Sequence, residues 1–170
     1  MRIQFWVALA VIAAAIAGCS KKPETAASGA ESQPGTSASS TEASVEWVTD
    51  FEAAKQKAAV EGKDLLIDFS GSDWCFWCKK LDGEVFSKPV FIEEAAKQFI
   101  FVMLDFPSDK SGQSEELQAQ NKRLAEQFGI KGYPTVILAK ADGTQYAQTG
   151  YQEGGPEAYL AHLKELREKQ

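Results

Sequence analysis

Two cysteines separated by two residues, Cys75 and Cys78, are the side chains of this sequence best suited to chemistry. This spacing brings both sulfur atoms together across one helical turn. The pair lies where an apolar run, 65–69, gives way to a helical pattern, so Cys75 falls at a helix N-terminus. Unpaired N–H groups and the helix dipole there favour a thiolate, the form that attacks disulfides. We therefore expect Cys75 to be the exposed nucleophile and Cys78, one turn deeper, to be the resolving thiol.

Other uses of a cysteine pair fit this sequence less well. A zinc site needs two further ligands, yet the single histidine, His162, stands on the polar side of the last expected helix. Covalent haem attachment needs a histidine directly after the second cysteine, where Lys79 stands. A permanently closed structural disulfide remains an alternative to redox exchange. We expect neither a metal nor another cofactor.

The third cysteine, Cys19, has a different setting. Arg2 and the uncharged apolar stretch 5–16 have the charge and length of a signal peptide, and the stretch is too short to span a bilayer comfortably. The following Ile-Ala-Gly-Cys run at 16–19 resembles the lipobox of bacterial lipoproteins. The resemblance implies that residues 1–18 are a lipoprotein signal peptide and that Cys19 is lipidated, which removes its thiol from redox chemistry. An ordinary signal peptide, or a membrane anchor with an incidental cysteine, is the alternative.

The composition changes after the lipobox. Residues 19–44 are rich in Ser, Ala, Thr, Gly, Glu and Pro and contain no aromatic residue, so they cannot bury enough apolar surface to offset the entropy of ordering. We expect a flexible, lipid-anchored linker that holds one domain, residues 45–170, off the membrane. The expected location is the bacterial cell envelope, facing the periplasm. Ser20 at the position after the lipidated cysteine favours the outer membrane, by resemblance to enterobacterial sorting rules.

The charge balance argues against a nucleic-acid partner. The formal net charge is -6 and the pI is near 4.9, whereas binding to nucleic acid calls for a basic patch. A hydrophobic fraction of 44% is ordinary for a soluble protein. We expect a monomeric domain.

Helical and strand patterns alternate along the predicted domain. Thr49 and Glu52 match a capping box, which predicts that a helix begins at this point and ends near Gly62. Asp142-Gly143 predicts a hairpin between two strands. The later elements are expected as a strand at 65–69, a helical stretch from 75 to about 98 broken near 89, a strand at 100–104, a helix at 114–128, strands at 135–139 and 145–149, and a helix from 156. This order predicts an α/β sandwich with a mixed sheet.

Two segments resemble the thioredoxin-like family. Residues 68–69 and 74–79, Asp-Phe and Trp-Cys-Phe-Trp-Cys-Lys, look like the family's active-site region, and Gly150 also fits. Residues 128–135, Phe-Gly-Ile-Lys-Gly-Tyr-Pro-Thr, look like the segment that contains its cis-proline. The resemblance implies a thioredoxin fold, with a mixed central β-sheet and helices on both faces. Secreted members, such as the C-terminal domain of the bacterial thiol:disulfide interchange reductase, are the most similar subgroup.

The resemblance implies a catalytic role for Asp68. This residue would be a buried carboxylate beneath Cys78 that accepts a proton when Cys78 attacks. A carboxyl group without a partner in an apolar strand has a raised pKa, which suits a base near neutral pH. The alternative is a strand-end acid bonded to a neighbouring helix.

The resemblance also implies a substrate-binding surface. Pro134 would be cis and lie against the cysteine pair, and the backbone of Tyr133 would pair with an extended substrate segment. Trp74 would pack beside the site and shape the docking surface, unless it belongs to the core. Phe76 and Trp77 complete the expected substrate-binding residues.

Three features depart from the usual family pattern. Residues 70–73 are one residue longer than in ordinary thioredoxins, which leaves the reach from Asp68 to Cys78 open. Phe76-Trp77 brings no cation to stabilise a thiolate, which disfavours a strongly oxidising couple. Residues 106–113 form a longer loop than usual, to which the sequence assigns no function.

We expect a thiol:disulfide oxidoreductase that reduces or exchanges disulfides in envelope proteins. Because that compartment is oxidising, the protein would need an electron donor, and a membrane-embedded disulfide reductase is the expected partner. The alternatives are a disulfide oxidase or isomerase, and a non-catalytic binding or assembly lipoprotein whose disulfide is structural.

Overall fold

The structure is a computed structural model and describes residues 46–170. The expected signal peptide 1–18, the linker 19–44 and the lipidated Cys19 lie outside the described residues and stay predictions. The elements follow the expected order: α1 (Phe51–Glu61), β1 (Asp64–Ser70), α2 (Phe76–Leu81), the π-helix η1 (Asp82–Phe86), α3 (Pro89–Ala95), β2 (Phe99–Asp105), the 3₁₀ turn η2 (Lys110–Gly112), α4 (Glu115–Gln127), β3 (Thr135–Ala139), β4 (Gln145–Thr149) and α5 (Gly155–Glu168).

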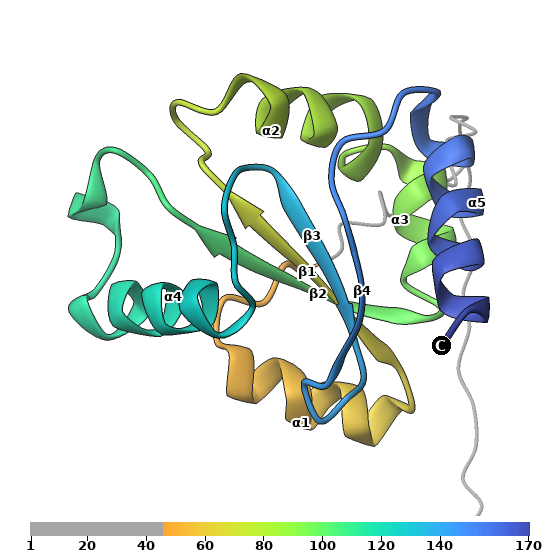
Figure 1. Ribbon diagram of the computed structural model, residues 1–170, viewed down its shortest axis with the longest axis horizontal. Helices are drawn as coiled ribbons and strands as arrows, with labels where there is room; N and C mark the ends of the chain where they lie inside the picture. The colour runs from red at the N-terminus through yellow and green to blue at the C-terminus, as the bar shows by residue number, and fades with distance from the viewer. Residues whose placement is uncertain (1–45) are drawn as a thin grey trace, which may run out of the picture. The chain divides into compact units, whose positions relative to one another are not determined.

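The strands form one four-stranded sheet in the order β2-β1-β3-β4 (Figure 1). Strand β1 pairs in parallel with β2 and antiparallel with β3, and β3 pairs antiparallel with β4. Every residue of β1 is buried, as expected of a strand with a neighbour on each side and helices on each face. The mixed sheet predicted from the sequence is confirmed.

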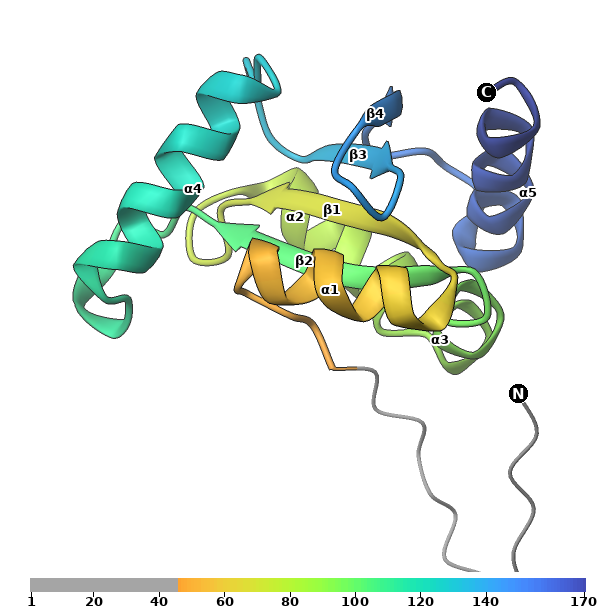
Figure 2. The same ribbon diagram turned by 90° about the horizontal axis from the view of Figure 1, so that it is seen from below.

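Helices cover both faces of the sheet (Figure 2). Leu65, Ile67 and Phe69 of β1 pack with α1 and α4, whereas Leu66 packs with η1, α3 and α5. This alternation follows from the two-residue repeat of a strand, and it gives the domain two apolar layers. Within residues 46–170, no helix is long and apolar enough to cross a membrane.

The start of α1 differs from the predicted capping box. The N-cap residue is Asp50, whose carboxylate accepts a backbone N–H of the first turn at 3.0 Å, so the prediction of Thr49 as N-cap was wrong. The physical reason is a tertiary contact: the side chain of Gln120 donates to the Thr49 carbonyl at 2.8 Å and accepts the N–H of Phe51 at 3.1 Å. The predicted end is confirmed, because Gly62 is the C-cap residue with φ of 65°.

The topology brings two loops to the same edge of the sheet. Strands β1 and β2 run in parallel (Figure 1), and their carboxyl ends, Ser70 and Asp105, are partners in the register. The chain leaves β1 toward α2 and leaves β2 toward α4 from this edge. The N–H of Phe106 donates to the carbonyl of Ser70 at 2.8 Å, so the two loops begin side by side although the sequence separates them.

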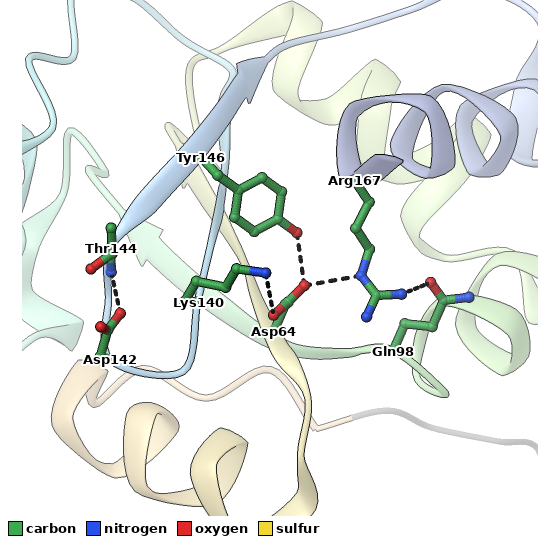
Figure 3. A network of polar contacts seen from close by, with 7 residues as sticks. All are labelled: Asp64, Gln98, Lys140, Asp142, Thr144, Tyr146 and Arg167. Atoms are coloured by element: carbon green, nitrogen blue, oxygen red, sulfur yellow. Dashed lines mark hydrogen bonds and ion pairs between the residues drawn. The ribbon is translucent and has the colours of Figure 1, made fainter. Parts of the chain in front are cut away.

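The opposite end of β1 carries a polar cluster around Asp64 (Figure 3). Asp64 is buried, and its Oδ2 accepts the hydroxyl of Tyr146 at 3.0 Å and Nε of Arg167 at 2.9 Å. Nζ of Lys140 lies 3.8 Å from Oδ1, and Arg167 also donates to Gln98. Burial, followed by the charge of Asp64, raises the pKa of Tyr146. The cluster joins β1 to the β3–β4 hairpin and to α5.

Asp64→Ala is expected to lower the free energy of unfolding by about 2–3 kcal/mol, because a hydroxyl and a guanidinium lose a buried acceptor. Lys164→Ala, on the same helix as Arg167, removes only an exposed ion pair with Glu168 at 3.9 Å. It should lower the free energy of unfolding by less than about 0.5 kcal/mol. Urea denaturation at pH 7 measures both variants. Equal, small losses would contradict a structural role for the cluster.

Candidate active site

The cysteine pair forms a disulfide at the start of α2. Cys75 is the N-cap residue of this helix, and Cys78 lies in its first turn. The backbone N–H of Cys78 donates to Sγ of Cys75 at 3.2 Å. The same N–H group stabilises the sulfur of Cys75 as a thiolate once the disulfide opens. The pair therefore has local geometry suited to disulfide exchange.

The two cysteines do not differ in exposure as expected. Cys75 is 5% exposed and Cys78 is 4% exposed, so the prediction of an exposed Cys75 is wrong for the disulfide form. The N–H of Cys75 donates to the carbonyl of Gly71 at 2.8 Å, so the turn formed by residues 71–75 closes on the backbone of Cys75. Their surroundings do differ, because Cys78 lines a cavity with Asp68 whereas Cys75 directly follows the exposed Trp74.

Asp68 is a buried carboxyl group in β1. It is 4% exposed, and no group within residues 46–170 donates a hydrogen bond to its Oδ1. Burial is the main cause that raises the pKa of Asp68 to about 8, and the negative charges of Asp82 and Asp105 add to it. The raised pKa predicted from the sequence agrees with this environment. At pH 7 the carboxyl group is therefore mostly protonated, and its ionised fraction can accept a proton as a general base.

A cavity of about 260 Å³ connects Asp68 with Cys78. Both residues therefore line one cavity although the 70–73 segment is longer than in ordinary thioredoxins. Asp82 and Asp105 also line this cavity, and neither was predicted from the sequence as a site residue. Asp82 follows Cys78 by one helical turn, a spacing that could have indicated it, whereas only the pairing of β1 with β2 brings Asp105 to the site.

Trp74 forms an exposed wall next to the disulfide. It is 51% exposed, so the alternative that places it in the core is wrong. Its Nε1 donates to the carbonyl of Phe106 at 2.8 Å, and its ring meets Tyr133 edge-on with centroids 5.6 Å apart. A Cβ atom on Gly71 would lie 2.5 Å from the indole, so only glycine lets the ring rest on the backbone there.

Phe76 and Trp77 form a second exposed aromatic group. Phe76 is 69% exposed and Trp77 is 48% exposed. The ring of Trp77 packs on Tyr151 with centroids 5.2 Å apart, and the amine of Lys80 lies over both rings at 5.2 and 4.9 Å. Tyr151 was missed in the sequence because it follows β4 and reaches α2 only through the fold.

The peptide bond between Tyr133 and Pro134 is cis, as the family resemblance implied. A Cβ atom on Gly150 would lie 3.0 Å from the carbonyl oxygen of Pro134, which explains a glycine at that position. The hydroxyl of Tyr159 donates to the Gly150 carbonyl at 3.1 Å and ties this segment to α5. The pairing of Tyr133 with a substrate stays a prediction.

Comparisons with known proteins agree with this geometry. The family model of the thioredoxin-like domain matches residues 51–167. The chain is 31% identical over 122 residues to the disulfide bond reductase DsbH of Chlamydia pneumoniae, which covers 72% of each chain. It is 30% identical over 118 residues to the thiol:disulfide interchange protein DsbD of Actinobacillus pleuropneumoniae. That match covers 68% of this chain but spans only 18% of DsbD.

Two solved structures have the same fold. A structure described as the DsbH oxidoreductase superposes with a TM-score of 0.70 at 26% identity, covering 86% of this chain and 96% of that one. The oxidised C-terminal domain of DsbD from Neisseria meningitidis has a TM-score of 0.50 at 20% identity, covering 71% and 98%. The chain belongs to the thioredoxin-like family. With its Cys75–Cys78 pair, it is a thiol:disulfide oxidoreductase.

Proposed function

We propose that this chain reduces or exchanges disulfides in proteins of the bacterial envelope through Cys75 and Cys78. One observation carries the proposal. The sulfur of Cys75 accepts a backbone N–H at a helix start, while Cys78 shares a cavity with the buried carboxyl group of Asp68. The name of the relative DsbH, a disulfide bond reductase, supports the same direction of reaction.

The proposed reaction begins at Cys75. Its thiolate attacks one sulfur of a substrate disulfide, forms a mixed disulfide and releases the other sulfur, which takes up a proton. Cys78 then passes its proton to the ionised form of Asp68 and attacks Sγ of Cys75, which releases the second substrate sulfur as a thiolate that takes up a proton. The substrate gains two electrons and the Cys75–Cys78 disulfide closes. A dithiol of a membrane-embedded disulfide reductase supplies the two electrons that reopen it.

The lysines beside the pair support a reducing couple. A cation at the thiolate would lower the thiol pKa and make the couple more oxidising. The amine of Lys79 instead donates to the carbonyl of Asp73 at 2.7 Å. The amine of Lys80 lies over the rings of Trp77 and Tyr151. Both charges are thus engaged with groups other than the sulfur atoms.

The proposed docking surface for the substrate is aromatic. Trp74, Phe76 and Trp77 are exposed beside the disulfide, and aromatic side chains provide large contact areas with little loss of rotamer freedom. The backbone of Tyr133 at the cis Pro134 offers an edge to an extended segment of the substrate.

The proposed location follows from the predicted lipid on Cys19. A tether of the predicted composition keeps the domain close to the membrane and gives it a high effective concentration near a membrane-embedded electron donor. Attachment to the outer membrane and a monomeric state belong to the same proposal. Globomycin treatment of cells would test the anchor, because a lipoprotein precursor accumulates with its signal peptide only if Cys19 is modified.

The redox potential of the Cys75–Cys78 couple is expected to lie at or below about −220 mV, close to the glutathione couple. Equilibration of the full chain with glutathione buffers, followed by thiol trapping, measures this value. A potential well above the glutathione couple would exclude the reductase direction and favour a disulfide oxidase. Failure to accelerate insulin reduction by dithiothreitol would favour a structural disulfide.

A further inference from the structure

Two segments that depart from the family pattern bind each other in the structure. We name residues 71–74, which include three of the four residues of the longer segment 70–73, the active-site loop, and residues 106–113 the β2 loop. Ser72 donates its N–H and its hydroxyl to the carboxylate of Asp105, the last residue of β2, at 2.8 and 2.6 Å. The longer active-site loop is therefore fastened to the end of β2, directly before the β2 loop begins.

The carboxylate of Asp73 links the active-site loop directly to the β2 loop. Its carboxylate accepts the N–H of Ser108 at 2.9 Å and the N–H of Asp109 at 3.1 Å. The hydrogen bond from Ser108, followed by the one from Asp109, lowers the pKa of Asp73, so this carboxylate is ionised at neutral pH. We call the contact of the Asp73 carboxylate with these two N–H groups the clamp. The carbonyl of Asp73 also accepts the amine of Lys79 at 2.7 Å, which joins the clamp to α2.

The β2 loop in turn holds the indole of Trp74. The hydrogen bond from Nε1 of Trp74 ends on the carbonyl of Phe106, the first residue of the β2 loop. The ring of Phe106 stacks on Phe69 and packs on Tyr133, with centroid distances of 6.4 and 5.3 Å. A displacement of the β2 loop therefore moves the acceptor that orients the exposed ring beside the disulfide.

We propose that Asp73 is a positioning residue that holds the β2 loop against the active-site loop, fixes the exposed indole of Trp74 beside Cys75, and thereby favours polypeptide disulfides over small ones. A polypeptide substrate buries the exposed indole of Trp74 when it docks, whereas a small disulfide needs only access to the sulfur of Cys75. Asp73 acts through Trp74 and does not touch the substrate. The inference rests on the proposed disulfide exchange and adds a determinant of its specificity.

The test compares Asp73→Ala and Asp73→Asn with the wild-type full chain, each reduced and mixed with insulin or with hydroxyethyl disulfide. The second-order rate constant of Asp73→Ala with insulin should fall by roughly fivefold or more, the size of a weakened interface contact. Its rate constant with hydroxyethyl disulfide should stay within about twofold of the wild-type value, because a small disulfide does not contact the indole of Trp74. Asp73→Asn should lie between Asp73→Ala and the wild type, because its carbonyl oxygen still accepts one N–H group.

The matched control is Asp142→Ala. Asp142 is likewise an exposed aspartate that accepts a backbone N–H, from Thr144 at 2.8 Å, in the hairpin at the other end of the sheet (Figure 3). This variant should leave both rate constants unchanged. Thermal denaturation should show that all variants are folded. In samples labelled with 5-fluorotryptophan, the ¹⁹F resonance of Trp74, assigned with Trp74→Phe, should shift in Asp73→Ala and stay in place in Asp142→Ala.

The outcomes separate the inference from the proposed function. Reduction of hydroxyethyl disulfide by the wild type tests the exchange chemistry itself. An equal loss for insulin and for hydroxyethyl disulfide in Asp73→Ala, or an unmoved Trp74 resonance, would overturn the positioning role. A selective loss for insulin together with a moved resonance would establish it.

Discussion

Cys78→Ser should lower the multiple-turnover rate of insulin reduction by on the order of 10³-fold or more, because an intramolecular thiol at high effective concentration no longer resolves the mixed disulfide. In this variant the backbone N–H of residue 78 still donates to Sγ of Cys75, so Cys75 still attacks the substrate. The variant should therefore accumulate covalent complexes that non-reducing gels separate and that dithiothreitol releases. Mass spectrometry of the complexes formed in the cell envelope then identifies the substrates.

Cys75→Ser is the matched control for the trap. It removes the proposed nucleophile and leaves Cys78 in the cavity that it shares with Asp68, so it should show neither turnover nor covalent complexes. Cys19 is the same in both variants, and any complex formed through it would appear in both. Equal trapping by the two variants would contradict the assignment of Cys75 as the attacking residue.

Asp68→Asn is expected to stabilise the folded protein at neutral pH while it slows the reaction. The pKa of Asp68 is raised from 3.8 to about 8 in the folded state. Between these values the folded state holds one proton more than the unfolded state, so the free energy of unfolding falls by about 1.4 kcal/mol per pH unit as the pH rises. The Asn variant lacks this loss and should be more stable by about 4 kcal/mol at pH 7.

Urea denaturation of the oxidised proteins across the pH range measures this difference. The two proteins should be nearly equal at about pH 3 or below, where Asp68 is protonated in both states, and the gap should widen toward pH 8. A constant gap at all pH values would show that the carboxyl group of Asp68 does not titrate as its burial requires. The comparison is independent of catalysis, since it uses only the closed disulfide.

The kinetic effect of the same substitution concerns the second step. Without the carboxyl group, the attack by Cys78 should slow by roughly 10²-fold, the usual contribution of a general base. Asp82→Asn is the companion variant, because it keeps the base and removes a charge that raises the pKa of Asp68. It should shift the inflection of the pH–rate profile to lower pH. An unchanged inflection in Asp82→Asn would exclude Asp68 as the titrating group.

Local patterns of the sequence were sufficient to predict the redox pair and the order of the elements. The Cys75–Cys78 spacing, the apolar run of β1 and the residues around Pro134 are properties of short segments, and helix and strand repeats are set by neighbouring residues. Residue type alone also indicated a raised pKa for Asp68, because a carboxyl group in an apolar strand loses its hydration.

Tertiary structure alone decided how these parts meet. The clamp between Asp73 and Ser108 joins residues 35 positions apart, and it exists because β1 and β2 end at the same edge of the sheet. The capping of α1 by Asp50, the exposed position of Trp74, and the cavity that Asp68 shares with Cys78 also depend on contacts between distant segments. Side-chain type and spacing describe what a segment prefers, whereas packing selects which distant group it binds. For that reason the sequence indicated the disulfide chemistry, and only the fold showed which residues hold its surroundings in place.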